Sequence, residues 1–131
     1  MRINLTSGDC LNDILSAKNT NELFVSFGEA MITGTYTARL FSDDFILERA
    51  LTHGVSVEEY KRKLHGFLTF LEDVNFYDEV VLWFGDEPFC RANRSVLLNT
   101  LKEYGFKGKI ILNIVNEETG DILEILPCSL N

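Results

Sequence analysis

The sequence predicts an α/β domain of the three-layer α/β/α type, with a mostly parallel sheet of four to five strands in a Rossmann-like or flavodoxin-like arrangement. Apolar runs of strand length alternate along the chain with segments of helical periodicity. The segments between the strands are long enough for parallel crossovers. Val80–Phe84 is continuously apolar, as expected of a strand that is covered on both faces. With 131 residues, 46% of them apolar, the chain fits one domain spanning residues 1–131.

The first part of the chain predicts two strands joined by a helix. Ile3–Thr6 is a short, partly alternating apolar run, which indicates a strand. A turn separates it from Leu11–Ala17, where the apolar residues have helical spacing. Leu23–Phe27 is the second expected strand, and the glycine and threonine content of residues 30–37 favours a loop.

The middle of the chain predicts two helices. Asp43 or Asp44 is expected to cap a helix that runs to about His53. Ser56 and Glu59 have the spacing of a capping box, which indicates the start of a second helix. That helix is expected to be continuous, because its apolar residues form a single stripe. The stripe consists of Tyr60, Leu64, Phe67, Leu68 and Leu71.

The last third of the chain predicts three strands and one helix. Asp78–Phe84 is the most apolar strand, and Arg91–Tyr104 is the helix that follows it, with Val96, Leu97, Leu98 and Leu101 expected to face inward. Lys109–Val115 is the fourth expected strand. Asp121–Leu126 is a short fifth strand that is expected to end at Pro127.

Composition argues against several classes of function. The chain has 20 acidic and 12 basic residues, and its net charge of -8 disfavours nucleic-acid binding. The start, MRINLTSGDC, does not resemble a signal peptide, and no apolar run approaches the length of a membrane span. The three cysteines lack the spacing of a disulfide framework or a zinc site. We therefore expect a cytoplasmic protein with no metal site and no cofactor required by its sequence.

Three turns that hold most of the unusual polar residues are expected to meet at the carboxyl edge of the sheet. These turns are Ser7–Cys10, Phe27–Gly34 and Gly85–Cys90. In open parallel sheets, ligands bind beyond this edge. The candidate ligand-binding residues are Gly8, Asp9, Glu29, Arg49, Trp83, Asp86, Glu87 and Phe89.

The acidic candidates each have a structural alternative. Asp9 is placed to cap the helix that follows it, and Glu29 is equally consistent with a solvated loop carboxylate. Asp86 and Glu87 form a carboxylate pair that suits a divalent cation or acid and base roles, but acids before a proline are also typical of a helix start. Arg49 is expected to form an ion pair with an acid at this edge, for which Asp9, Glu29 and Asp86 are the candidates.

Cys90, together with the carboxylates Asp86 and Glu87, is a candidate for catalysis. Cys90 falls in the first turn of the expected helix, where the helix dipole lowers the pKa of a thiol, although a small buried hydrophobic role is the commoner one. His53 and His65 lie outside the three turns, so a cysteine–histidine pair is not expected.

The segment Asp78–Asn93, DEVVLWFGDEPFCRAN, resembles a strand followed by an acid-rich Phe-Cys segment in the bacterial proteins grouped as domain of unknown function 1835. The resemblance extends from about Ile3 to Val115, with weaker matching blocks along it. These blocks are Ser7-Gly8-Asp9, Phe27-Gly28-Glu29 with Gly34, Arg49-Ala50 and Ser56–Tyr60. The resemblance implies an α/β fold and a cytoplasmic bacterial protein, and it implies no assigned activity.

Three positions depart from the pattern of that family. The small hydroxyl residue that usually follows Gly-Asp is Cys10 in this chain. Asp86 stands where the family often has a histidine before the second acid, and Arg91 stands where it usually has a glutamine after the Phe-Cys pair. If those side chains carry the family's chemistry, this chain has an altered form of it or has lost it.

The leading hypothesis is an α/β domain that binds a small molecule or a metal-associated ligand at the carboxyl edge of its sheet. An acidic edge of this kind suits a cationic ligand, a metal-bridged ligand or ribose hydroxyls. One alternative is a hydrolase or transferase that uses paired carboxylates or Cys90. Another is a protein-interaction or regulatory module, in which an exposed edge strand (Lys109–Val115 or the terminal segment) makes a homodimer.

Overall fold

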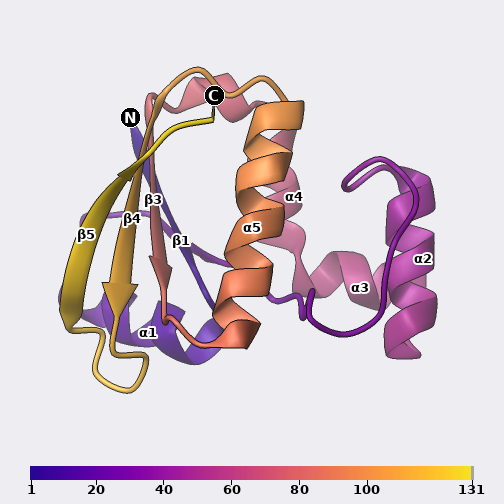
Figure 1. The fold of residues 1–131 in the computed structure, drawn as a ribbon, viewed down its shortest axis with the longest axis horizontal. Coiled ribbons are helices and arrows are strands. Elements are labelled where there is room, and N and C mark those ends of the chain that lie inside the picture. The colour runs from indigo at the N-terminus through magenta and orange to yellow at the C-terminus, as the bar shows by residue number, and fades with distance from the viewer. Residues whose placement is uncertain (131) are drawn as a thin grey trace.

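Five strands form one mixed sheet in the order β2-β1-β3-β4-β5 in the computed structural model, which describes residues 1–130 (Figure 1). Strands β1 to β4 are parallel to their neighbours, and β5 pairs with β4 in the antiparallel direction. The strands are β1 (Arg2–Thr6), β2 (Phe24–Ser26), β3 (Glu79–Phe84), β4 (Lys109–Val115) and β5 (Ile122–Cys128). The prediction of an α/β fold with a mostly parallel sheet is confirmed.

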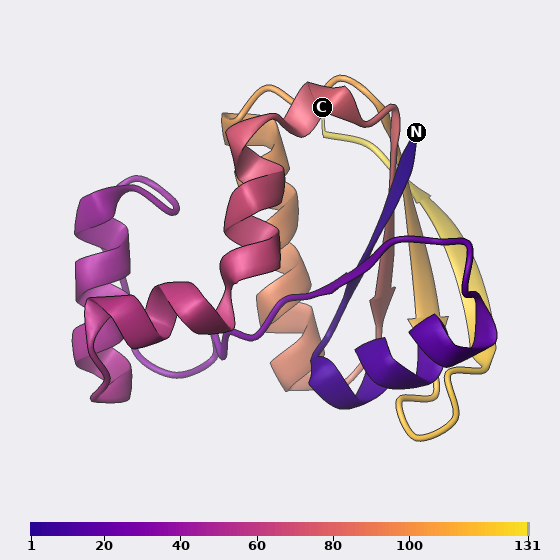
Figure 2. The same cartoon turned by 180° about the vertical axis from the view of Figure 1, so that it is seen from behind.

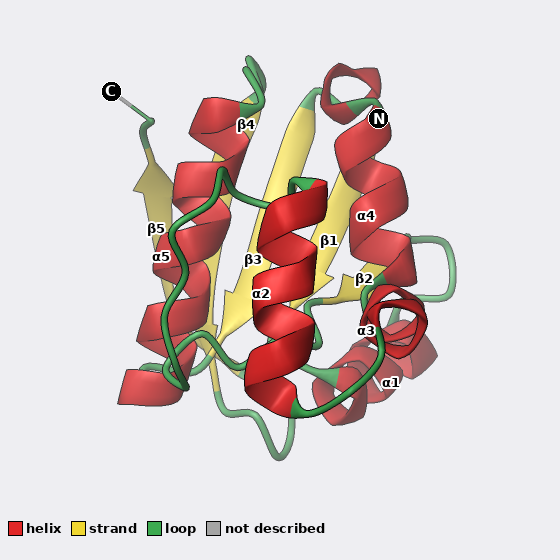
Figure 3. Cartoon of the chain, turned by 90° about the vertical axis from the view of Figure 1, so that its right-hand side faces the viewer, coloured by secondary structure: helices red, strands yellow, loops and turns green. Residues whose placement is uncertain are grey.

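Helices cover both faces of this sheet. They are α1 (Asp9–Lys18), α2 (Asp43–His53), α3 (Val57–Lys63), α4 (His65–Glu72), the 3-10 turn η1 (Val74–Phe76) and α5 (Pro88–Glu103). Figures 1 and 2 show α4 and α5 against one face, with α2 and α3 outside them and α1 near the carboxyl ends of the strands. Figure 3 looks onto the α2 side and shows α1 behind α3, below the strands and near β2.

The larger core lies between the sheet and helices α4 and α5, and it continues outward to α2. Val80, Leu82 and Phe84 of β3 point into it, as the period of two along a strand requires. Phe27, which follows β2, packs against α4 and the segment before α2, with its ring centroid 4.9 Å from that of Phe67 and 6.0 Å from that of Phe41. These contacts fix the chain directly before Gly28 and Glu29.

A smaller core lies under α1 on the opposite face. It contains the buried residues Leu11, Leu15, Phe24 and Val115, with Trp83 packed against them. Among the described helices, α1 alone packs on this face. The other residues of the smaller core, Phe24, Val115 and Trp83, come from the strands.

Two predictions about the middle helices are wrong. Ser42, and neither Asp43 nor Asp44, caps α2, because its hydroxyl accepts a hydrogen bond from the Phe45 amide at 3.2 Å. The single helix expected after Ser56 is broken at Leu64, which separates α3 from α4. Gly66 is the second residue of α4, and a Cβ there would lie 2.9 Å from Val25 of β2. The start of α4 therefore packs closely against the sheet.

Other boundaries differ by a few residues. Helix α5 begins at Pro88 rather than Arg91, because proline is well suited to the first helical position. Leu98, expected to face inward, is only half-buried. Strand β5 continues through Pro127 to Cys128. An edge strand tolerates proline, because it has no second neighbouring strand that would need the missing N–H donor. None of the helices among residues 1–130 has the length and apolar composition that crossing a membrane requires.

Candidate functional site at the carboxyl edge of the sheet

The turns after β1 and β2 and the start of α5, which follows β3, contribute to one cavity of about 410 Å³ at the carboxyl edge of the sheet. Helices α2 and α3, together with the segments that adjoin them, close the side of this cavity away from the strands. The lining residues are Ser7, Gly8, Phe27, Gly28, Glu29, Ala30, His53, Val55, Tyr60, Lys63, Leu64 and Phe89. We refer to this space as the edge cavity.

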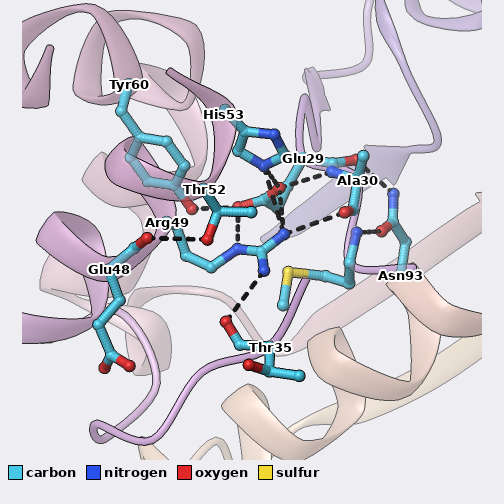
Figure 4. Close-up of polar contacts among 10 residues, drawn as sticks. Glu29, Ala30, Thr35, Glu48, Arg49, Thr52, His53, Tyr60 and Asn93 are labelled. Carbon is cyan, nitrogen blue, oxygen red and sulfur yellow. Dashed lines mark hydrogen bonds and ion pairs between the residues drawn. The ribbon is translucent and has the colours of Figure 1, made fainter. Parts of the chain in front are cut away.

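One wall of the edge cavity is built on the carboxyl group of Glu29, whose side chain has no exposed surface (Figure 4). Arg49 of α2 holds both of its oxygens, with Nε donating to Oε2 at 3.0 Å and Nη2 donating to Oε1 at 3.1 Å. The Tyr60 hydroxyl donates to Oε2 at 2.5 Å, and His53 Nε2 lies 2.5 Å from Oε1. The Ala30 amide donates to Oε1 at 2.6 Å, so the carboxylate is fully satisfied.

These contacts determine the charge states of the wall. Burial opposes ionisation of Glu29, but hydrogen bonds, that from Arg49 foremost, lower its pKa to about 2. Burial and the neighbouring Glu29 carboxylate raise the pKa of Tyr60, so its phenol stays protonated. The negative charge of Glu29 is therefore offset by the positive charge of Arg49 inside the protein.

The loop after β2 is held over the edge cavity from two sides. The side-chain amide of Asn93 in α5 donates to the Glu29 carbonyl at 2.7 Å and accepts from the Met31 amide at 2.8 Å. Arg49 donates to the carbonyls of Ala30 at 3.0 Å and Thr35 at 3.3 Å. The buried side chains of Arg49 and Asn93 thus supply backbone hydrogen bonds that this loop, having no regular secondary structure, would otherwise lack.

A second polar cluster lies beside the edge cavity, at the carboxyl ends of β3 and β4. Cys90 has no exposed surface, and its thiol donates to Glu87 Oε1 at 2.9 Å and to Glu117 Oε1 at 3.3 Å. Ser7 donates a short hydrogen bond to Glu117 Oε2. One ligand atom from each of Glu87, Cys90 and Glu117 fits within 4.8 Å of the other two.

The pKa values of the two carboxyl groups in this cluster are shifted in opposite directions. Burial and the adjacent Glu87 raise the pKa of Glu117, whereas the hydrogen bond with Glu117 lowers the pKa of Glu87. Burial, together with both carboxyl groups, raises the pKa of the Cys90 thiol. The buried role, the commoner of the two considered for Cys90, is the one observed, and the alternative of a lowered pKa is wrong because a buried site beside two acids disfavours the thiolate.

The structure brings together half of the predicted binding residues. Gly8, Glu29 and Phe89 line the edge cavity, and Arg49 lies behind Glu29. The expected ion pair of Arg49 is confirmed, with Glu29 as its partner among the candidates.

The other predicted residues do not line the edge cavity. Asp9 is exposed and accepts a hydrogen bond from the Ser26 hydroxyl at 2.6 Å. Asp86 is exposed and pairs with two arginines of α5 at 3.1 and 3.2 Å. Glu87 belongs to the second polar cluster, where it contacts Cys90. Trp83 lies on the opposite face of the sheet, where its Nε1 donates to Asn4 Oδ1 at 2.9 Å.

Sequence reasoning missed His53, Tyr60, Lys63 and Glu117. Two signals could have found His53 and Glu117. Arg49 and His53 are four residues apart on one helix, so a position of Arg49 at the sheet edge brings His53 there as well. Glu117 follows β4, whose carboxyl end lies at the same edge as those of β1 and β3 because these strands are parallel.

No family model, no curated protein and no solved structure matches this chain. The resemblance to domain of unknown function 1835 therefore stays a prediction.

Proposed function

We propose that this chain is a small-molecule-binding domain and that the edge cavity is its binding site. The observation that carries the proposal is a cavity of about 410 Å³ at the carboxyl edge of parallel strands, walled by a buried, fully hydrogen-bonded Glu29–Arg49 pair. Its volume falls in the range of about 300–1,000 Å³ that is common for small-molecule sites.

The topology supports the same position. The order β2-β1-β3-β4-β5 reverses direction between β1 and β3, and doubly wound sheets of this order bind ligands at that point. The turn after β1 supplies Ser7 and Gly8, and the helix after β3 supplies Phe89. We propose a flavodoxin-like arrangement on this basis, with β5 added at the edge in the antiparallel direction.

The wall is suited to binding because it is rigid before a ligand arrives. Glu29, Arg49 and Asn93 are fully buried or nearly so, and their hydrogen bonds link the loop after β2 to α2 and α5. A site whose groups are already ordered loses less conformational entropy on binding. The proposal concerns an organic ligand, because Glu87, Cys90 and Glu117 satisfy one another through their own hydrogen bonds.

Filling the cavity provides the test. Gly8 has an extended backbone, and a Cβ at this position meets no atom within 4 Å, so Gly8→Leu adds a side chain to the cavity lining without a clash. Fragment compounds are screened by the change in melting temperature and by amide chemical shifts. We expect the compounds that shift the amides of Gly28 and Ala30 to lose their effect in Gly8→Leu.

The matched control is Ser95→Leu, which adds the same side chain to an exposed position of α5 outside the cavity lining. It should retain the binding of every compound. Compounds that bind Gly8→Leu as well as the unaltered chain, or that shift no amide at the edge cavity, contradict the proposal.

A second proposal concerns β5, which is an edge strand with several exposed apolar side chains. Ile122, Leu123 and Ile125 have 46%, 68% and 60% of their surfaces exposed. We propose that β5 pairs with β5 of a second copy, because an antiparallel edge strand is complementary to itself across a two-fold axis. Leu123→Lys should shift a dimer to monomer in sedimentation equilibrium, and Leu51→Lys, at a leucine of α2 that is 73% exposed, should not. A monomer at all concentrations contradicts this proposal.

A further inference from the structure

The acidic side chains at the carboxyl edge do not face the edge cavity as free charges. Asp9 accepts a hydrogen bond from Ser26, and Asp86 is paired with Arg91 and Arg94. Neither aspartate lines the cavity. The expectation of a cationic ligand depended on these acids, so the structure removes its main support.

Glu29 is the only acid among the described lining residues, and its charge is already compensated. Its two oxygens are held by Arg49, and the side chains of both residues have no exposed surface. A ligand therefore meets a neutral ion pair at this wall. Displacing Arg49 to free the carboxylate would leave a buried charge without its partner, which is strongly unfavourable.

Apart from Glu29 and the protonated phenol of Tyr60, the ionisable groups of the lining are basic. Lys63 is exposed at the end of α3 and forms no ion pair among residues 1–130. Its backbone carbonyl lies against the turn after β2, because a Cβ on Gly28 would lie 3.4 Å from it, so this end of α3 adjoins the cavity. His53 lines the cavity with a quarter of its side chain exposed.

Apolar side chains form another part of the lining. Phe27, Val55 and Leu64 line the cavity, and Phe89 is exposed over 39% of its surface at the same site. Such a surface fits the hydrophobic body of a ligand, and the basic groups then interact with its polar end.

We propose that the edge cavity binds an organic anion, a carboxylate or a phosphate monoester carried on an apolar body. This inference rests on the proposed binding function and adds the charge class of the ligand. Lys63 provides the charge contact, a local attraction that acts against the general repulsion of anions by the protein's net charge of -8. A lysine is a suitable point-charge partner for either anion.

Pairs of compounds that differ only in charge test the proposal. Benzoate is compared with benzamide, phenyl phosphate with phenol, and benzylamine serves as the cationic member. Binding is followed through the amide chemical shifts of Gly8, Gly28 and Ala30. We expect at least one anion to bind about ten-fold more tightly than its neutral counterpart and to weaken as salt is added. The two anion arms distinguish a carboxylate site from a phosphate site.

Matched lysine variants assign the contact. Lys63→Gln should weaken anion binding by about ten-fold, as expected for the loss of one charge-assisted contact. Lys61→Gln removes a charge of the same basic run at an exposed residue that does not line the edge cavity, and it should change affinity by less than about two-fold.

Three outcomes overturn the inference, and they separate it from the binding function. If the neutral or cationic members bind as tightly as the anions, the charge class is wrong while the cavity still binds. Equal effects of the two lysine variants likewise remove Lys63 as the anion contact. If no compound of any charge shifts the amides at the edge cavity, both proposals fail together.

Discussion

Replacing Glu29 by glutamine removes the negative charge from a side chain with no exposed surface and leaves the guanidinium of Arg49 buried beside a neutral amide. Breaking a buried ion pair by removing one partner costs about 3–5 kcal/mol. The pKa of Glu29 supplies an independent figure. Its lowering from 4.5 to about 2 corresponds to about 3 kcal/mol in favour of the charged form. The two routes agree, so Glu29→Gln should lose about 3–4 kcal/mol of unfolding free energy at neutral pH.

Urea denaturation at pH 7, followed by the fluorescence of Trp83, measures this loss. Trp83 is the only tryptophan of the chain and is partly buried. Glu58→Gln is the matched control, because Glu58 is exposed on α3, and it should change stability by less than about 0.5 kcal/mol. If Glu29→Gln does not fold, Tyr60→Phe removes one hydrogen bond to the same carboxylate and should cost about 1–3 kcal/mol.

The loss should depend on pH in a defined direction. The pKa of Glu29 is lowered on folding, so its stabilising contribution is present above its unfolded value near 4.5 and is lost as the pH falls toward 2. The difference between the unaltered chain and Glu29→Gln should be constant above about pH 5.5 and shrink between about pH 4.5 and 2. A difference that does not change with pH would refute the assignment of the charged form.

A double variant tests whether the two residues act as a pair. Arg49→Met leaves Glu29 buried without its partner, and Glu29→Gln with Arg49→Met removes both charges. The cost of the double variant should be clearly smaller than the sum of the two single costs, with a coupling of about 1–3 kcal/mol. Additive costs would show that the pair is not the unit that stabilises this wall.

Three further predictions concern other parts of the molecule. At pH 8, a thiol reagent should modify the exposed Cys10 quickly and leave Cys90 untouched until the chain unfolds, because Cys90 is buried and its thiol pKa is raised. Peptide mass spectrometry after timed labelling measures this, and early labelling of Cys90 would contradict it. Gly34→Ala should lose about 1–3 kcal/mol in urea denaturation, because φ is +73° there and an added Cβ would lie 2.5 Å from a methyl group of α2; Gly8→Ala, with open space around it, should lose less than about 1 kcal/mol. Asn113→Leu should leave the unfolding free energy unchanged or raise it by up to about 1 kcal/mol, because the buried amide oxygen of Asn113 has no partner among the described residues. A loss of unfolding free energy of more than about 1 kcal/mol in urea denaturation would contradict this.

The strands were predictable because their signals are local. Val80–Phe84 is continuously apolar, and the structure covers β3 on both faces and places it between two parallel neighbours. Lys109–Val115 was predicted with the boundaries that β4 has. Whether the terminal segment joins the sheet depends on pairing with β4, a long-range contact that no local pattern in residues 121–131 specifies.

The candidate site was predictable in position but not in chemistry. Parallel topology alone brings the turns after β1, β2 and β3 to one edge, so Gly8, Glu29 and Phe89 could be expected there. Side-chain direction was partly predictable as well: with Val80, Leu82 and Phe84 facing one core, the period of two along a strand places Trp83 on the other face. The partners of Glu29 were only partly predictable, because Arg49, His53 and Tyr60 come from helices 20 to 31 residues further along the chain.

The partners change what the acids do, and this has a consequence for how the site works. An unpaired carboxylate at a cavity wall attracts cations, whereas Glu29 is held by Arg49, Tyr60 and His53 and keeps its charge inside the protein. Its contribution to a ligand is then indirect. It fixes α2 and α3 against the turn after β2 and thereby places Lys63 and His53 at the cavity. A ligand that binds without disturbing this network should leave the pH dependence assigned to Glu29 unchanged, and only a ligand that displaces Arg49 would alter it.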